Sequence, residues 1–191
     1  EKLKETNRAQ IGKYDAENFA EPSGNFSYFK EKGNEKFTGQ RSLMQDATGN
    51  IWIGETRGNI ISLNGQVFTN YTPENENSEN TIFDIKQDRQ GNIWFAKKYD
   101  GISKFNGQYF TNYSEKEGLP CKKIFSMYED KKRNLWFGTD GAGICKYDGA
   151  KLINYTEKEG FFGKSVTTII EDKKGTLWLG TLGAGVCRFD G

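Results

Sequence analysis

Short apolar runs, bounded by polar and turn-forming residues, make up most of the chain. One unit of the pattern contains four such runs, at residues 81–87, 92–96, 101–105 and 108–113. Each has the length of an ordinary strand and is rich in aromatic and β-branched residues. No stretch shows the 3.6-residue period of an amphipathic helix. The pattern therefore predicts four short strands per unit, which we name a, b, c and d.

The segments between the runs have the composition of tight turns. Runs c and d are separated by Asn64-Gly65, Asn106-Gly107 and Asp148-Gly149, which tolerate the positive φ angles of a type I′ hairpin turn. Runs a and b are joined by DATGN, DRQGN, DKKRN and DKKGT, in which the aspartate is expected to cap the turn by accepting backbone N–H groups. A calcium loop would need more oxygen ligands than these turns contain.

The four-strand pattern recurs with a constant period. Trp52, Trp94, Trp136 and Trp178 are each 42 residues apart, and the same step relates the four aspartates that open the a–b turns. Four antiparallel strands in a unit of about 40 residues are typical of a β-propeller blade. Because each tryptophan lies between apolar neighbours, we interpret it as a core residue rather than as a platform for a sugar.

The last repeat has runs a, b and c, and the sequence ends at its c–d turn. A counterpart of the missing run d lies near the N-terminus, where Phe26 and Phe29 precede Phe68 and Tyr71 by 42 residues. We therefore predict an all-β fold, a four-bladed β-propeller of 42-residue repeats, closed by an N-terminal outer strand that completes the last blade. Closure would leave no exposed sheet edge. We favour a monomeric ring, and two chains that share strands in one eight-bladed ring are the alternative.

This register sets the predicted boundaries. A polar N-terminal tail covers residues 1–23, and the propeller covers residues 24–191. Within the propeller we expect a closing strand at 24–30, blade 1 at 39–72, blade 2 at 81–114, blade 3 at 123–156, and blade 4 at 165–191 together with the closing strand.

The four repeats, roughly residues 24–191, resemble the two-component regulator propeller repeat family. The resemblance lies in NLWFGTDGAGICKYDG at residues 134–149 and in EDKKGTLWLGTLGAGVCRFDG at residues 171–191, and the first two repeats depart from it at residues 54–60 and 96–102. It implies a β-propeller. In better-known family members such propellers form the periplasmic sensor part of bacterial hybrid histidine kinases and often respond to glycans. Because the sequence shows no kinase, receiver or DNA-binding helix, the resemblance implies a free-standing exported propeller.

Ligand-binding residues are expected where the repeats differ. In an antiparallel blade the a–b and c–d turns lie on one face of the disc, and the longer b–c and d–a connections lie on the other. Loops on a rigid scaffold commonly carry function, so we predict that the b–c/d–a face binds the ligand. Its polar and aromatic residues suit a sugar or a peptide carboxylate, although they can also be read as solvated loop residues. The candidate ligand-binding residues are Arg57, Lys98, Tyr99, Asp100 and Asp140.

One position of run a is small and polar in every repeat. It is occupied by Ser42, Asp84, Ser126 and Thr168. Since strand a lines the central channel of a propeller, we interpret these four residues as channel lining. The alternative is a ring of hydroxyls, with one carboxylate, that holds water or an ion.

Composition excludes several kinds of chemistry. The 191 residues include 27 basic and 26 acidic side chains, a net charge of +1, which provides no electrostatic footprint for nucleic acid or anionic lipid. There is no histidine, so zinc lacks a ligand set. The three cysteines, Cys121, Cys145 and Cys187, cannot all pair with one another. We interpret Cys145 and Cys187, which share one position of the repeat, as small buried apolar residues rather than as a disulfide or a metal site. No apolar run approaches the roughly 18 residues that cross a bilayer. The sequence starts with Glu1, which suggests a trimmed product whose export signal is not visible.

These observations predict a non-catalytic binding or sensor module, without cofactor or metal, for a glycan or a protein partner. We expect it in the periplasm or outside the cell. The absence of histidine removes the usual general base. The alternative is a hydrolase or lyase in which Asp84, Asp100 and Asp140 converge at the channel mouth, as a pair of glycosidase carboxylates would.

Overall fold

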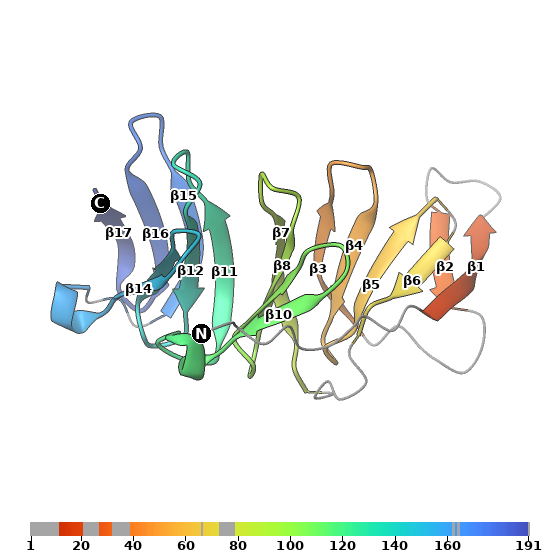
Figure 1. The fold of residues 1–191 in the computed structure, drawn as a ribbon, viewed down its shortest axis with the longest axis horizontal. Coiled ribbons are helices and arrows are strands. Elements are labelled where there is room, and N and C mark those ends of the chain that lie inside the picture. Colours follow the sequence, from red (N-terminus) through yellow and green to blue (C-terminus); the bar gives the residue numbers. More distant parts are fainter. Residues whose placement is uncertain are drawn as a thin grey trace.

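Four antiparallel sheets follow one another along the chain (Figure 1). The computed structural model describes residues 12–20, 27–31, 39–65, 67–72, 79–161, 163 and 165–190. Each sheet contains one 42-residue repeat, and we number the sheets 1 to 4 in chain order. The predicted all-β class is confirmed.

The strands have the following bounds. Sheet 1 contains β3 (Gln40–Gln45), β4 (Ile51–Glu55), β5 (Ile60–Asn64) and β6 (Val67–Asn70), and β1 (Gly12–Ala20) and β2 (Ser27–Glu31) extend its outer edge. Sheet 2 contains β7 (Ile82–Gln87), β8 (Ile93–Lys97), β9 (Ile102–Phe105) and β10 (Phe110–Tyr113). Sheet 3 contains β11 (Ile124–Glu129), β12 (Leu135–Thr139), β13 (Ile144–Tyr147) and β14 (Leu152–Tyr155). Sheet 4 contains β15 (Ser165–Glu171), β16 (Leu177–Leu182) and β17 (Gly185–Phe189).

Two d–a connections each contain one short 3₁₀ helix, η1 (Glu115–Glu117) and η2 (Glu157–Glu159). In η1 the hydroxyl of Ser114 accepts a hydrogen bond from the backbone N–H of Lys116, and the carboxylate of Glu117 accepts one from the backbone N–H of Ser114. This is a capping box, and Gly118 ends the helix in the left-handed conformation. The strand pattern did not predict these helices, but the Ser-x-x-Glu spacing is a signal for them.

Each a–b turn is held by its aspartate, as predicted, and the aspartate also binds the tryptophan of the same repeat. In sheet 3 the carboxylate of Asp130 accepts hydrogen bonds from the backbone N–H of Asn134 and from Nε1 of Trp136, both at 2.8 Å. Burial alone would raise the pKa of Asp130, but the bonds from Trp136 and Asn134 outweigh it and hold this pKa below its usual range. The corresponding bonds to Trp52, Trp94 and Trp178 measure 2.8, 2.7 and 3.0 Å. The turn and the core residue are therefore fixed by one charged group.

The core lies between neighbouring sheets. Trp94 of sheet 2 packs against Tyr113 of its own sheet at 5.6 Å and against Phe137 of sheet 3 at 5.9 Å between ring centroids. Trp52 and Trp136 are buried in the same way, which confirms their predicted core role, whereas Trp178 is partly exposed. The three cysteines are free; Cys145 is buried, as expected for a small apolar residue, whereas Cys187 is only partly buried.

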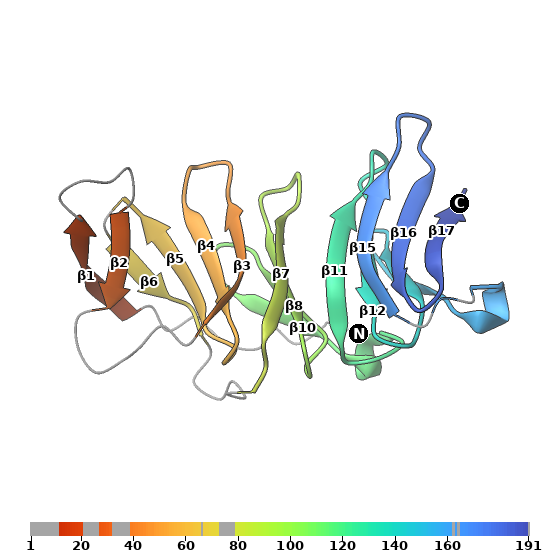
Figure 2. The same ribbon diagram turned by 180° about the vertical axis from the view of Figure 1, so that it is seen from behind.

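The N-terminal strand does not close a ring. Ser27–Glu31 pairs with β1, and β1 pairs with β6 of sheet 1, so β17 remains the outer strand of a three-stranded sheet 4. Sheet 4 and the β1–β2 hairpin lie at opposite ends of an open row, as Figures 1 and 2 show. This corrects the prediction that residues 24–30 complete the last blade, although Phe26 lies outside the described residues. It also places a strand, β1, inside the predicted tail.

The cost of ordering the chain explains this difference. A hairpin joins two strands that are neighbours in sequence, whereas pairing β2 with β17 would close a loop of most of the chain. The open edge of β6 offers unpaired backbone groups within the same part of the chain, and β1 occupies it.

Candidate functional site

The loops divide between two faces of the row, as the strand order requires. In Figure 1 the a–b hairpins β3–β4, β7–β8 and β15–β16 project from the upper face, and η1 lies on the lower face. The lower face is the b–c/d–a face, on which all five candidate ligand-binding residues were expected.

The b–c loop of sheet 2 brings three of the candidates together. The Nζ of Lys98 lies 4.6 Å from the centroid of the Tyr99 ring, and the Tyr99 side chain is 39% exposed. The buried side chain of Asn80 holds the loop from below: its Nδ2 donates to the Asp100 carboxylate at 2.6 Å, and its Oδ1 accepts the backbone N–H of Tyr99 at 2.9 Å. An aromatic ring, an ammonium group and a carboxylate thus share one anchored loop.

Asp140 has a different environment, between sheets 3 and 4. One carboxylate oxygen lies 2.6 Å from Nζ of Lys123, and the other accepts a hydrogen bond from the hydroxyl of Ser165 at 2.5 Å. The contact with Lys123, followed by the bond from Ser165, holds the pKa of Asp140 below its usual range. Asp140 is therefore ionised, and it ties two sheets together. Arg57, the fifth candidate, is exposed in the b–c loop of sheet 1.

Three of the four predicted channel residues connect the first strands of neighbouring sheets. The hydroxyl of Ser42 donates to the carbonyl of Ile82 at 3.0 Å, and the hydroxyl of Ser126 donates to the carbonyl of Val166 at 3.3 Å. The carboxylate of Asp84 accepts the backbone N–H of Met127 at 2.8 Å. Thr168, at the same position of sheet 4, is exposed.

The carboxyl of Asp84 is the titratable group of this set. Burial raises its pKa, and the opposing effects of Lys86 and of the backbone hydrogen bonds are smaller. Asp84 and Asp140 therefore have pKa values shifted in opposite directions. Each shift has a local structural cause, since Asp84 is buried beside the backbone of Met127 and Asp140 is paired with Lys123 and Ser165.

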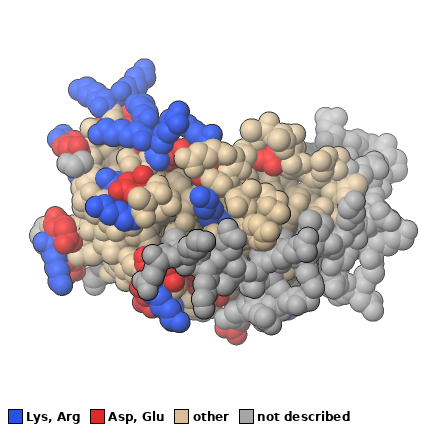
Figure 3. Space-filling view, in the orientation of Figure 1, with Lys and Arg blue, Asp and Glu red and all other residues tan. Residues whose placement is uncertain are grey.

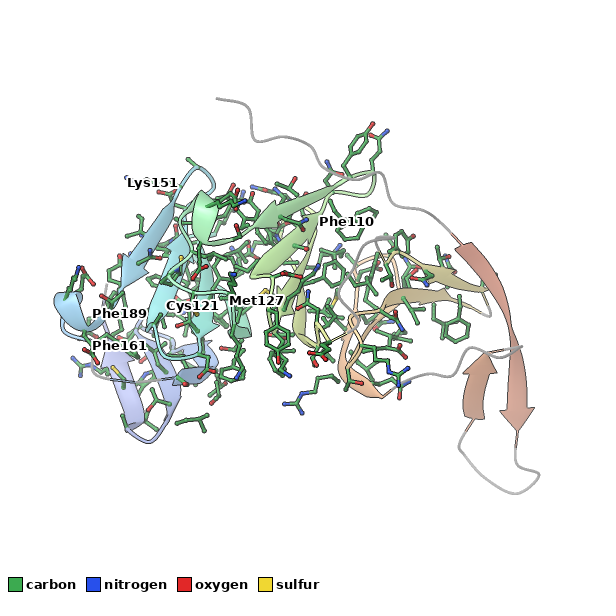
Figure 4. All side chains as sticks on the ribbon, turned by 90° about the horizontal axis from the view of Figure 1, so that it is seen from below. Phe110, Cys121, Met127, Lys151, Phe161 and Phe189 are labelled. Atoms are coloured by element: carbon green, nitrogen blue, oxygen red, sulfur yellow. The ribbon has the colours of Figure 1, made fainter. Side chains whose placement is uncertain are left out.

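A cavity that the sequence did not predict lies between sheets 3 and 4, next to the a–b turns of these two sheets. Its volume is about 170 Å³, and its walls include Trp136, Tyr155, Phe189 and Lys146. The Tyr155 and Phe189 rings lie 4.9 Å apart, and Figure 4 shows Phe189 at the end of the row that sheet 4 forms. At the equivalent place between sheets 2 and 3, Leu152 of the fourth strand packs against the core. The cavity thus lies beside β17, the outer strand of sheet 4 among the described residues.

Charge is unevenly distributed over the surface. Basic side chains gather at the upper rim above sheets 3 and 4 (Figure 3). The a–b turns of these sheets carry Lys131, Lys132, Arg133, Lys173 and Lys174. The ammonium of Lys131 donates to the carbonyl of Asp172 at 2.7 Å, so part of this charge serves the contact between the two sheets.

Three segments of the chain match the profile of the two component regulator propeller, at residues 77–96, 118–141 and 160–183. Each segment contains the a–b hairpin of one sheet with its Asp–Trp pair. These are repeats of the two component regulator propeller family. The regulator propeller repeats thus coincide with sheets 2, 3 and 4. A search of curated proteins finds no match.

Solved structures similar to this chain come from bacterial proteins. The extracellular domain of BT3049, assigned to the hybrid two component systems of B. thetaiotaomicron, is 23% identical with a TM-score of 0.69, over 85% of this chain and 25% of that one. Virginiamycin B lyase from Staphylococcus aureus, solved with quinupristin, is 16% identical with a TM-score of 0.65, over 94% and 60%. PorZ, a surface component of the type-IX secretion system of Porphyromonas gingivalis, is 14% identical with a TM-score of 0.62, over 85% and 27%.

These likenesses show the β-propeller fold. The chain spans 60% of the lyase and about a quarter of the other two proteins. The fold thus occurs both in an extracellular domain of a two component system and in an enzyme. In the described part of the chain, no helix has the length and apolar character needed to cross a bilayer. Those residues also contain no group of three acidic or cysteine side chains arranged to hold a metal ion.

Proposed function

We propose that this propeller is a non-catalytic binding module that recognises a glycan or a protein partner through its b–c/d–a face. The observation that carries the proposal is the anchored loop with Lys98, Tyr99 and Asp100. An exposed ring provides a stacking surface for a sugar or an apolar side chain, and the flanking charges provide hydrogen bonds to hydroxyl or carboxylate groups.

Asn80 holds this loop in a fixed conformation, which favours ligand binding. Its two hydrogen bonds fix the backbone at Tyr99 and the carboxylate of Asp100 before any ligand arrives. A preorganised loop loses less conformational entropy on binding, so more of the contact energy appears as affinity.

A glycan array, followed by titration of the best ligand, tests the proposal. We expect Tyr99→Ala to weaken binding at least about tenfold, the effect of losing one central aromatic contact of about 1.4 kcal/mol. Tyr109→Ala is the matched control, because Tyr109 lies beside the c–d turn of the same sheet, on the opposite face. Binding that survives both Tyr99→Ala and Arg57→Ala would exclude this face.

A second candidate is a carboxylate-based hydrolase or lyase at the channel mouth. In this candidate Asp84, whose pKa burial raises, is the proton donor, and Asp140, which is paired with Lys123, is the ionised group; it requires that a ligand reach both carboxyl groups. The expected sign is turnover of a bound ligand that Asp84→Asn abolishes while binding persists. A ligand that binds without turnover in the unaltered protein excludes this candidate.

We also propose that the protein works in the periplasm or outside the cell. BT3049 and PorZ support this location, because their structures are an extracellular domain and a bacterial surface component. Fractionation of expressing cells tests it, and recovery from the cytoplasm alone would contradict it.

A further inference from the structure

The first strand of every sheet contains a β-bulge at the same place. In sheet 2 the register of β7 against β8 shifts between Ile82 and Asp84, so Phe83 has no partner on β8. Sheets 1, 3 and 4 shift at the equivalent position. A bulge re-aims the side chain of its extra residue and is common beside functional sites. We call the bulged residues of the four sheets the bulge row: Arg41, Phe83, Phe125 and Thr167.

Members of the bulge row contact one another from sheet to sheet. The guanidinium carbon of Arg41 lies 5.6 Å from the centroid of the Phe83 ring, and the rings of Phe83 and Phe125 lie 5.1 Å apart. Both rings are only partly buried and lie outside the clusters of buried residues that the described sheets form. The Nζ of Lys123 lies 4.9 Å from the centroid of Phe125. The row thus presents two adjoining aromatic rings, each with a cation over it.

The bulge row lies at the b–c/d–a end of the first strands. Ile82, next to Phe83, pairs with Lys97, the last residue of β8 before the b–c loop. Figure 2 shows that the first strands β3, β7, β11 and β15 follow one another along the molecule. The bulge row therefore crosses from sheet to sheet on the proposed binding face, but it does not include the loop of Tyr99.

Arg41 provides the charge of this row that can meet a ligand. Lys123 is paired with Asp140 at 2.6 Å, and the carboxylate of Asp84 accepts the backbone N–H of Met127. Arg41 is exposed, and among the described residues no carboxylate lies within ion-pair distance of it. A guanidinium stacked on a ring keeps N–H groups that can bind a carboxylate. The row therefore favours an anionic group beside an apolar ring.

The backbone beside the bulges is already in use. The carbonyl of Ile82 accepts a hydrogen bond from the hydroxyl of Ser42, and the N–H of Met127 donates to Asp84. An extended peptide that adds a strand to a sheet needs such groups to be free. A ligand of the bulge row must therefore be held by side chains, through ring stacking and charge.

We propose that the bulge row binds an aromatic carboxylate, whose ring packs on Phe83 and Phe125 and whose carboxylate pairs with Arg41. Aromatic rings attract one another at offset or edge-to-face geometries, and a guanidinium binds a carboxylate through two parallel N–H groups. The ligand is either a free aromatic acid or the C-terminal aromatic residue of a peptide, since both have this chemistry. The inference rests on the proposed binding role of the b–c/d–a face.

Titration of the protein with phenylacetate at low ionic strength, followed by NMR chemical shifts, tests the proposal. Phenylacetate should bind at least about threefold more tightly than phenylacetamide, which lacks the charge, and than acetate, which lacks the ring. Arg41→Gln should abolish the preference for the acid over the amide, an effect that a purely structural role of Arg41 would not produce. Phe125→Leu and Phe83→Leu keep an apolar side chain and should each weaken phenylacetate binding about three- to tenfold.

Two variants on the opposite face are matched controls. Lys174→Gln removes an exposed cation from the a–b turn of sheet 4, and Tyr109→Leu removes a partly buried ring beside a c–d turn. Both should bind phenylacetate as the unaltered protein does. Titration with acetyl-glycyl-phenylalanine separates the two sources of the ligand: tighter binding than phenylacetate indicates a peptide C-terminus, and weaker binding indicates a free acid.

Several results would overturn the proposal. One is the absence of phenylacetate binding to the unaltered protein, and another is binding that both phenylalanine variants leave unchanged. Tighter binding of glucuronate than of phenylacetate would make the row a site for acidic sugars instead. Phenylacetate binding that is lost in Tyr99→Ala and kept in Phe125→Leu would place the ligand in the b–c loop, so the inference would fail while the proposed function stands.

Discussion

Replacement of Asp88 by asparagine tests the interaction that holds an a–b turn to its tryptophan. One carboxylate oxygen of Asp88 accepts hydrogen bonds from Nε1 of Trp94 at 2.7 Å and from Nδ2 of Asn92 at 2.8 Å. The other accepts the backbone N–H groups of Gln90 and Asn92 at 3.0 and 2.9 Å. Asparagine keeps one acceptor oxygen, but its NH₂ group places a donor opposite the indole N–H.

The burial of Trp94 sets the size of the effect. At 1% exposure its indole has no contact with water that replaces the lost acceptor. A hydrogen bond to a charged group contributes about 1.5–3 kcal/mol, and an unpaired buried donor costs about 1–3 kcal/mol. Since the backbone bonds of the turn can persist, we expect Asp88→Asn to lower the free energy of unfolding by about 3 kcal/mol.

The chain contains its own control. Asp172→Asn makes the same change in sheet 4, where the bond to Trp178 measures 3.0 Å and the indole is 37% exposed. Water can bind the freed N–H there, so the loss should be clearly smaller. Urea unfolding followed by circular dichroism, at a protein concentration where the chain is monomeric, measures both variants. Equal losses would refute the argument that burial of the indole determines the cost.

Three further predictions concern the same framework. Burial alone would raise the pKa of Asp46 and of Asp130, but hydrogen bonds hold both pKa values below the unfolded value. The two carboxylates therefore stabilise the fold above about pH 4, and this stabilisation is lost as the pH falls towards the folded pKa; equal urea midpoints at about pH 7 and about pH 3 would contradict this. Gly138→Ala places a Cβ 2.5 Å from the backbone carbonyl oxygen of Val166 in sheet 4, so it should lower the stability by about 1–3 kcal/mol in thermal unfolding. An unchanged melting temperature would show that sheets 3 and 4 lie farther apart. Burial raises the pKa of the Cys145 thiol to about 12, so Cys145 should react with a thiol reagent at about pH 8 far more slowly than the partly exposed Cys187. Similar reaction rates of the two cysteines would argue against the burial of Cys145.

The strands and turns of the repeats were predictable because their signals are local. The second-repeat runs at 81–87 and 101–105 match β7 (Ile82–Gln87) and β9 (Ile102–Phe105) within one residue at each end. Turn aspartates such as Asp88 were predicted from the same kind of information. The bond from Asp88 to Trp94 was not predicted, although both residues recur at a fixed spacing, because a spacing does not show where an indole N–H points.

The arrangement at the chain ends was not predictable in the same way. The spacing of the repeats did not show which segment pairs with the edge of β6. Edge pairing depends on backbone hydrogen bonds, which leave little trace in the side-chain pattern of a polar segment such as Gly12–Ala20.

The candidate site was predictable only as a location. Departures from the repeat pointed to the b–c loops, and the structure places Lys98, Tyr99 and Asp100 together in one of them. The anchoring by Asn80 and the ion pair of Asp140 with Lys123 join residues well separated in sequence, so no local sequence signal indicates them. Whether these residues bind a ligand stays a prediction.

The contacts between sheets bear on how such a gene can change. Hydrogen bonds from one sheet to the next join residues 40 apart, as between Ala47 and Gln87, Arg89 and Glu129, and Lys131 and Glu171. In-frame duplication or deletion of one complete unit would therefore preserve the spacing of every remaining contact, whereas a change of any other length would disrupt it. An array of this kind can grow or shrink by whole units in single genetic steps, with a packed protein at each step.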